Sequence, residues 1–257
     1  MAEQQKQEQG MIKVSASTGS ALLKLGAPAS LDWREQGAVT PVKAQGTCGT
    51  CWSFATVAMC ESSLVLQGKA FNNRIYSVNL SEQYLLKCTP GSSCNGGFLE
   101  NSIDKAIETG LPYESEFPYD PYGPNNGICS TSDLIPISNS SRVSKYYTSD
   151  NVIISMLLNG PVAIAVSAVG WENYNSGTYQ CPASAPINHA VLLIGYTSDY
   201  WIIKNSWGTN WGQNGFIYVT RNPLYNCGIG TAVHSLSAAA ITIWSILLLP
   251  AIILFIF

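Results

Sequence analysis

The chain has 257 residues, which is enough for one or two domains. Its 46 % hydrophobic content, against 11 % charged residues, predicts a buried core and excludes global disorder. A net charge of −3 gives no basic surface, so nucleic acid is not an expected partner. Eight cysteines indicate an oxidising compartment, and we expect a protein of the secretory or endolysosomal pathway.

The amino end carries no visible export signal. Residues 1–10 are polar, and the apolar run at 21–25 is too short for the core of a signal peptide. We expect residues 1–26 to be a disordered remnant or a truncated propeptide.

Three helices are predicted in the first half of the chain. Residues 51–67 have apolar side chains at helical spacing, and Gly68 is a natural stop. Ser81 can cap a second helix through "EQYLLKC", and residues 99–109 read as a third helix that ends at Gly110. Residues 113–150 have loop composition and would connect the two halves.

The second half is predicted to be mostly antiparallel strand. Its apolar segments are short, rich in β-branched or aromatic residues, and separated by turn residues. They are residues 161–168, 189–196, 200–207 and 215–221. The order of helices followed by strands predicts the α+β class.

The carboxyl end is apolar over residues 236–257, and no charged residue follows Arg221. Twenty-two such residues are long enough to cross a bilayer as a helix, so we predict a hydrophobic membrane segment at 238–257 and a membrane-associated protein. Two alternatives stay open, a buried core helix and a cleaved lipid-anchor signal.

One cysteine and one histidine provide the candidate chemistry. Cys51 begins the first predicted helix, where the macrodipole favours a thiolate, and a protonated His189 beside it would complete a reactive ion pair. Asn205 follows the strand after that of His189 and can fix the imidazole, with Trp207 shielding that bond from water. Gln45 and the Cys51 backbone N–H can stabilise an oxyanion.

The motifs resemble those of the papain and cathepsin L family of cysteine peptidases. They are "DWREQGAVTPVKAQGTCGTCW", "LSEQYLLKC", "CNGG", "NHAV" and "KNSWGTNWG", and they occur in the family's order over roughly residues 27–239. The resemblance implies a papain-like peptidase domain at 27–237. This domain would have a helical N-terminal lobe, an antiparallel β-barrel-like C-terminal lobe, and the active site between them.

The resemblance also implies disulfides and a substrate site. The disulfides would be Cys48–Cys94, Cys88–Cys129 and Cys181–Cys227, with Cys60 a buried free thiol. The backbone of Gly96 and Gly97 would bind an extended peptide. An apolar pocket would take the second side chain before the cleaved bond (P2), and its openness and lack of charge favour bulky apolar or aromatic side chains over basic ones. The matching positions are Phe98, Leu99, Val162, Ala165, Asn188, Ala190 and Ala232.

These features predict a cysteine endopeptidase that acts through a thioester, with polypeptide substrates, a monomeric catalytic domain, and no metal or cofactor. The alternative is an inactive, membrane-tethered homologue that binds peptides.

Cys48-x-x-Cys51 taken alone is also typical of a redox dithiol or half a zinc site, but the strand and helix order of thioredoxin is missing. With His189 assigned, His234 is the only other histidine in the sequence, so we expect the paired-histidine loop of dipeptide-trimming relatives to be absent. His234 itself is expected to be structural or interfacial. The short amino end means that either the gene model is truncated or the enzyme folds without the family's propeptide.

Overall fold

The computed structural model describes residues 26–68, 78–120, 129, 133–137 and 140–238. Helices gather in the first half and strands in the second, so the predicted α+β class is confirmed. The elements are β1 (Leu31–Asp32), α3 (Cys51–Leu66), α4 (Glu82–Cys88), α5 (Leu99–Thr109), β2 (Ser140–Tyr146), α6 (Asp150–Leu157), β3 (Val162–Val166), the 3-10 helix η4 (Trp171–Asn173), β4 (Thr178–Tyr179), β5 (His189–Tyr196), β6 (Tyr200–Lys204), β7 (Phe216–Thr220) and β8 (Ala232–Ala238).

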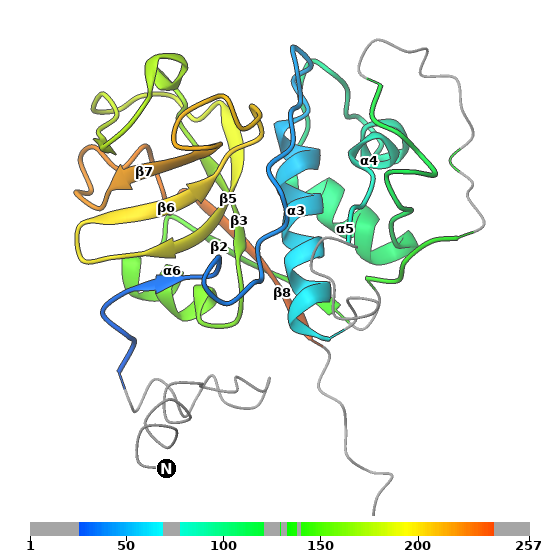
Figure 1. The fold of residues 1–257 in the computed structure, drawn as a ribbon, viewed down its shortest axis with the longest axis horizontal. Coiled ribbons are helices and arrows are strands. Elements are labelled where there is room, and N and C mark those ends of the chain that lie inside the picture. Colours follow the sequence, from blue (N-terminus) through cyan, green and yellow to red (C-terminus); the bar gives the residue numbers. More distant parts are fainter. Residues whose placement is uncertain (1–25, 69–77, 121–128, 130–132, 138–139, 239–257) are drawn as a thin grey trace, which may run out of the picture.

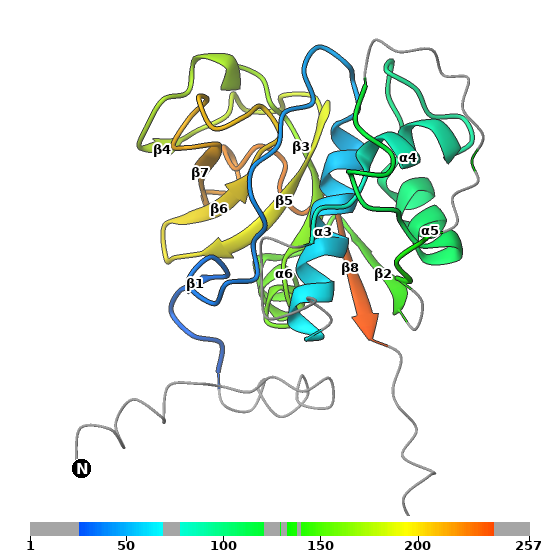
Figure 2. The same ribbon diagram turned by 45° about the vertical axis from the view of Figure 1, so that its right-hand side comes forward.

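Helix α3 lies between the two halves of the molecule. Figures 1 and 2 show α4 and α5 on one side of it and the sheet on the other. The strand order is β2-β8-β3-β5-β6-β7-β4, and β1 pairs with β5. All these pairs are antiparallel except β4 with β7. The helix that begins at Cys51 is therefore the element that joins both lobes.

Strand β5 is buried along its whole length because both of its faces are covered. Ala190, Leu192 and Ile194 belong to the hydrophobic cluster that contains the apolar residues of α3. Val191 and Leu193 belong to the core behind the sheet. An uninterrupted apolar run is the expected pattern for a strand with two buried faces. This double burial fixes the first residue of the strand, His189, at the boundary between the lobes.

The helix ends follow the sequence signals. The Ser81 hydroxyl accepts a hydrogen bond from the Tyr84 backbone N–H at 3.0 Å and so caps α4. Helix α5 ends at Gly110, whose φ of 81° is a backbone conformation that favours glycine. Helix α3 ends at Leu66, shortly before Gly68.

Six elements were not predicted: the short β1, η4 and β4, and three longer ones. Strand β2 lies inside the stretch assigned to loops, α6 begins at its end, and β8 extends into the apolar tail. Strand β2 has few apolar residues because it pairs only with β8 and is mostly partly exposed. Residues 236–238 belong to β8, so the sheet includes the start of the run that was predicted to be a membrane segment.

The predicted terminal segments lie outside the described residues, namely 1–25 and 239–257. Within the part of the chain that the structure describes, no helix has the length and apolarity needed to span a bilayer.

The disulfides are those that the family resemblance implies. The two cysteines left free are Cys51, which is partly exposed, and Cys60, which is buried. The bonded pairs are Cys48–Cys94, Cys88–Cys129 and Cys181–Cys227.

Candidate active site

Cys51 is the first residue of α3. Its predecessor Thr50 does not cap the helix, because the Thr50 hydroxyl lies 2.8 Å from that of Tyr119. The first-turn N–H groups are therefore free of side-chain caps and favour negative charge at the sulfur. The turn before the helix needs Gly49, where a Cβ would lie 2.5 Å from the carbonyl oxygen of Cys94. The bridge from Cys48 to Cys94 holds these two segments at that close approach.

His189 faces the same groove as Cys51 from the start of β5. Ala190, the residue after His189, also lines this groove, and its backbone lowers the pKa of the Cys51 thiol, against the effect of burial. Helix α3 and strand β5 thus supply the two members of the predicted pair from opposite sides of the groove.

Asn205 determines which histidine nitrogen carries hydrogen. The Asn205 Oδ1 accepts the backbone N–H of Ser206 at 2.8 Å, so this oxygen is the acceptor in its 2.8 Å contact with His189 Nε2. The Nε2 atom must then be the donor, and Nδ1 is left as the nitrogen that can exchange a proton with the thiol. The structure therefore brings together the predicted base and the predicted orienting amide in the arrangement that general base catalysis would need.

Indole rings enclose His189, whose exposed fraction is 8 %. The Trp207 ring centroid lies 5.1 Å from that of the imidazole, and Trp171 meets the imidazole edge-on at 5.9 Å. Trp211 stacks on Trp171 and donates its Nε1–H to the Trp171 carbonyl at 2.9 Å. Sequence reasoning found Trp207 but missed Trp171, which lies in a short 3-10 helix with no periodic pattern to mark it.

Burial opposes either charge taken alone. Desolvation lowers the pKa of His189 to about 4 and raises the pKa of the Cys51 thiol, although backbone N–H groups at Ala190, Trp52 and Cys51 act in the opposite direction on the thiol. Each charged form is thus costly unless the other is present. The thiolate and imidazolium are expected to form together by one internal proton transfer, and the reactive ion pair stays a prediction.

In a Cys51→Ala variant we expect His189 to titrate near pH 4, below its ordinary value of 6.5, because no thiolate remains to stabilise the imidazolium. The unfolded chain then binds its proton first, so stability should fall as pH decreases from about 6.5 to 4, by about 3 kcal/mol for this group. NMR titration of the two histidines in the variant and in the native chain measures this directly. A His189 that titrates at 6.5 or above in the variant would contradict the desolvation argument.

Gln45 is held in place by Ser206, the neighbour of Asn205. The Gln45 Oε1 accepts the Ser206 hydroxyl at 2.7 Å, and its backbone N–H donates to the Ser206 carbonyl at 2.9 Å. The amide Nε2 donates one hydrogen to the Cys48 carbonyl at 2.9 Å. A primary amide has a second hydrogen, which remains available for an oxyanion. Ser206 itself was not predicted, although it lies in the "KNSWG" motif.

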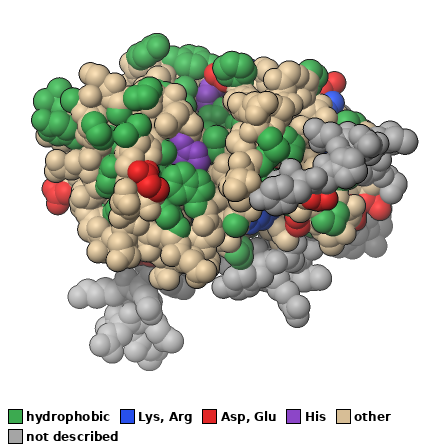
Figure 3. Space-filling view, turned by 90° about the horizontal axis from the view of Figure 1, so that it is seen from above, with side chains coloured by type: hydrophobic (Ala, Val, Ile, Leu, Met, Phe, Trp, Pro, Cys, Tyr) green, Lys and Arg blue, Asp and Glu red, His purple; other side chains and the backbone are tan. Residues whose placement is uncertain are grey.

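A groove of about 450 Å³ runs past Cys51 and His189. Figure 3 looks onto the end of the molecule at which α3 begins, where histidine and hydrophobic side chains lie near one another. The other predicted residues that line this groove are Gly96, Gly97, Phe98, Leu99, Ala165, Asn188, Ala190 and Ala232. The groove floor is close-packed, because a Cβ on Gly97 would lie 2.6 Å from the Trp52 ring.

Val162 was wrongly predicted to line the groove. Side chains alternate along β3, so Val162, Ile164 and Val166 point into the core behind the sheet, while Ala165 faces the groove. The exposed fraction of Val162 is zero. Trp207 is not among the groove-lining residues either, and it contacts His189 instead.

Two titratable side chains line the groove beside the predicted residues. Glu100 and His234 are among its lining residues, and sequence reasoning had given neither a role in binding. Glu100 lies on the first turn of α5, immediately after the predicted Leu99. His234 lies on β8, two residues after the predicted Ala232.

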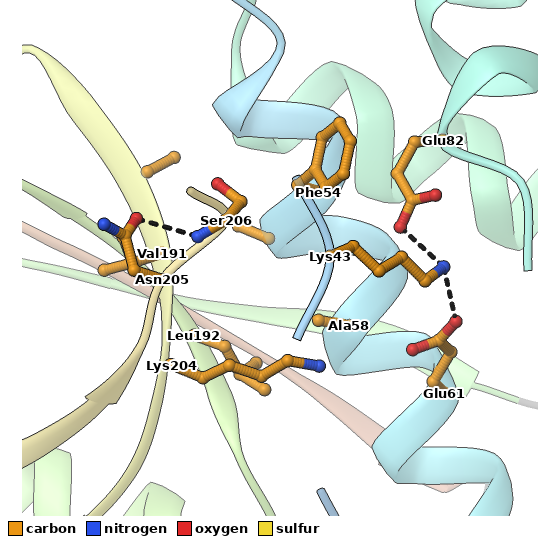
Figure 4. A pocket seen from close by; sticks show the side chains of 12 residues that line it. Lys43, Phe54, Ala58, Glu61, Glu82, Val191, Leu192, Lys204, Asn205 and Ser206 are labelled. Carbon is orange, nitrogen blue, oxygen red and sulfur yellow. Dashed lines mark hydrogen bonds and ion pairs between the residues drawn. The ribbon is translucent and has the colours of Figure 1, made fainter. Parts of the chain in front are cut away.

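A buried cluster of charges joins the lobes beside this site (Figure 4). Lys43 Nζ lies 2.9 Å from Glu61 of α3 and 2.8 Å from Glu82 of α4. Lys204 at the end of β6 donates to the Thr40 hydroxyl at 3.0 Å, and Thr40 in turn hydrogen-bonds Glu61. Lys204 directly precedes Asn205, so the cluster holds the strand that positions the orienting amide.

The comparisons of this chain with known proteins agree on one family. The sequence model described as "Papain family cysteine protease" matches residues 27–237. The Arabidopsis thaliana "Probable cysteine protease RD19B" is 37 % identical over 82 % of this chain and 63 % of its own length. The "Cathepsin L-like proteinase" of Fasciola hepatica is 37 % identical over 79 % of this chain and 64 % of its own length. The chain therefore spans slightly less than two thirds of these relatives.

Solved structures share the fold. The Carica candamarcensis cysteine protease CMS1MS2, whose crystal structure was determined in complex with E-64, superposes with a TM-score of 0.71 at 33 % identity. This match covers 82 % of this chain and 98 % of the other.

Proposed function

The chain belongs to the papain family of cysteine proteases, and from that premise we propose that it is a cysteine endopeptidase that cleaves polypeptides through a thioester acyl-enzyme. The supporting observation is the orientation of His189, whose Nε2 donates to Asn205 at 2.8 Å and leaves Nδ1 for the thiol. An inactive peptide-binding homologue would not need this tautomer to be fixed.

The residues divide the reaction into two proton transfers. Cys51 sulfur attacks the substrate carbonyl carbon, and the resulting oxyanion accepts hydrogen bonds from the Cys51 backbone N–H and the Gln45 amide. His189 gives its proton to the leaving amine as the C–N bond breaks, which leaves a thioester. His189 then takes a proton from water, the hydroxide adds to the thioester carbon, and the C–S bond breaks, so that Cys51 leaves as the thiolate as the carboxylic acid forms.

The proposal includes cathepsin L-like recognition of a bulky apolar or aromatic side chain at P2. Ala165 and Ala232 are small and line the groove, and Leu99 and Phe98 add apolar surface to it. Phe98 is 69 % exposed without substrate, so a bound side chain would cover it. Backbone groups of Gly96 and Gly97 border the same groove and would pair with the extended peptide.

The cellular setting is proposed from chemistry. Three disulfides are typical of an oxidising compartment, which fits a secretory or endolysosomal location. Membrane attachment through the hydrophobic segment at 238–257 and a monomeric catalytic domain complete the proposal.

Iodoacetamide applied to the native chain tests the nucleophile. We expect Cys51 to be alkylated and Cys60 to be spared, because Cys51 lines an open groove whereas Cys60 is fully buried and its pKa is raised by burial. Intact-mass measurement followed by peptide mapping locates the label, and a Cys51→Ala variant is the control. If Cys51 reacts no faster than Cys60, or only after unfolding, the thiol is not activated.

A further inference from the structure

One side chain that lines the groove is a carboxylate, which an apolar pocket does not explain. Among the described residues that line the groove, Glu100 is the only carboxylate, and none is a lysine or arginine. The Glu100 side chain is 29 % exposed, so it is open to a ligand. Small side chains at Ala165 and Ala232 line the same groove and leave room for a long substrate side chain.

One hydrogen bond holds the Glu100 carboxylate, and one histidine lies near it. The Tyr146 hydroxyl of β2 donates to Glu100 Oε1 at 2.8 Å. His234 Nε2 of β8 lies 3.6 Å from the same oxygen, beyond hydrogen-bond distance, and this buried nitrogen has no other partner. The carboxylate is therefore anchored at one oxygen and retains accepting capacity.

His234 does not cancel the charge of Glu100. Arg142 donates to the Ser144 hydroxyl at 2.6 Å, and Ser144 lies 2.9 Å from His234 Nδ1, so the hydroxyl hydrogen can donate to this nitrogen. The second ring nitrogen, Nε2, then carries the hydrogen of a neutral imidazole. Burial favours this neutral form, because desolvation lowers the pKa of His234.

The nearby arginine is already paired. Arg142 forms two hydrogen bonds with Asp104, at 2.7 and 2.8 Å. The charges of Arg142 and Asp104 compensate each other, and His234 is neutral. The groups that face Glu100 from α5, β2 and β8 therefore do not neutralise the negative charge of its carboxylate. Desolvation opposes this charge, but the pKa of Glu100 is lowered, because the helix backbone and the Tyr146 hydroxyl hydrogen-bond the ionised carboxylate.

We propose that Glu100 is a specificity-determining residue that binds the cationic end of an arginine or lysine side chain at P2. The inference rests on the proposed peptidase function and extends its substrate class beyond apolar and aromatic side chains. The aliphatic stem of such a side chain would lie along Ala165 and Ala232, and its charged end would form a charge-assisted hydrogen bond with the carboxylate.

The test uses the full chain and two blocked peptides that differ only in having arginine or leucine at P2. We expect Glu100→Gln to lower the arginine-to-leucine ratio of kcat/KM by about tenfold or more, because the neutral amide loses a charge-assisted bond. The matched control is Glu108→Gln on the same helix, whose carboxylate is 71 % exposed and pairs with Lys105. This control should keep the native ratio. An unchanged ratio in Glu100→Gln overturns the inference while leaving the peptidase function intact.

Binding provides a readout that does not depend on catalysis. Calorimetry compares the same peptides on Cys51→Ala and on Cys51→Ala with Glu100→Gln. We expect selective loss of arginine-peptide affinity in the second variant, even if the native chain hydrolyses neither peptide. Equal affinities for the two peptides on both variants would refute the role of Glu100, whereas absence of hydrolysis with intact selectivity would refute only the peptidase function.

Discussion

Replacement of Cys51 with serine is expected to reduce kcat/KM by roughly 10⁴-fold or more, a loss typical of removing a nucleophile from a catalytic triad. The serine hydroxyl has nearly the same shape but is far less acidic than a thiol, so His189 cannot generate its anion at neutral pH. The measurement is hydrolysis of a blocked fluorogenic peptide with phenylalanine at P2. The variant should still bind the peptide, because the groove and the Gln45 amide are unchanged.

Cys60 provides the matched control for this substitution. It is the other free cysteine, it lies nine residues further along α3, and it is fully buried. Cys60→Ala should therefore keep native kcat/KM, with only the modest stability loss of a small core truncation. If the native chain and Cys51→Ser have equal turnover, or if neither has any, the inactive peptide-binding alternative is favoured over the endopeptidase.

The site was predictable where chemistry and chain order coincide. Cys51 and His189 stand out because a helix start and a rare histidine are features of the sequence itself. Asn205 could be placed beside His189 because a short turn joins β5 to β6, and antiparallel neighbours bring residues far apart in sequence into contact. The fold class followed from the same patterns.

The remaining parts of the site depend on tertiary contacts that no pattern in the neighbouring sequence predicts. Trp171 packs on His189 from a 3-10 helix, and the sequence around it looks like an ordinary loop. Val162 was misplaced because a one-residue difference along a strand reverses the face to which a side chain points. Glu100 lines the groove because α5 packs beside β2 and β8, a tertiary arrangement that sequence spacing does not encode.

Strand β2 shows which part of the fold the sequence alone does not predict. Its segment "SSRVSKY" is polar enough to read as a loop, yet it forms a seven-residue ladder with β8. The partner strand supplies the hydrogen bonds, so the intrinsic strand propensity of the β2 residues has little influence on whether this strand forms. The same pairing accounts for residues 236–238, whose apolar composition suggested the start of a membrane segment.

The largest stability effect is expected from Lys43→Met. Methionine fills similar volume but removes the positive charge that faces Glu61 and Glu82, both of which are at most 2 % exposed. Burial already raises the pKa of Glu82 to about 8, and Lys43 opposes that shift. Loss of one partner from a buried ion cluster costs about 3–5 kcal/mol, which for a domain of this size lowers Tm by about 10 °C.

Two further variants separate charge from packing. Lys105→Met removes a lysine that pairs with the exposed Glu108, so it should change stability by less than about 1 kcal/mol. Adding Glu82→Gln to Lys43→Met should recover part of the lost stability, because the Glu82→Gln substitution removes a buried charge that has lost its partner. Denaturant unfolding with the disulfides intact measures all four chains. If Lys43→Met and Lys105→Met cost the same, the buried cluster does not hold the lobes together, and the position of Asn205 must depend on the β5–β6 pairing alone.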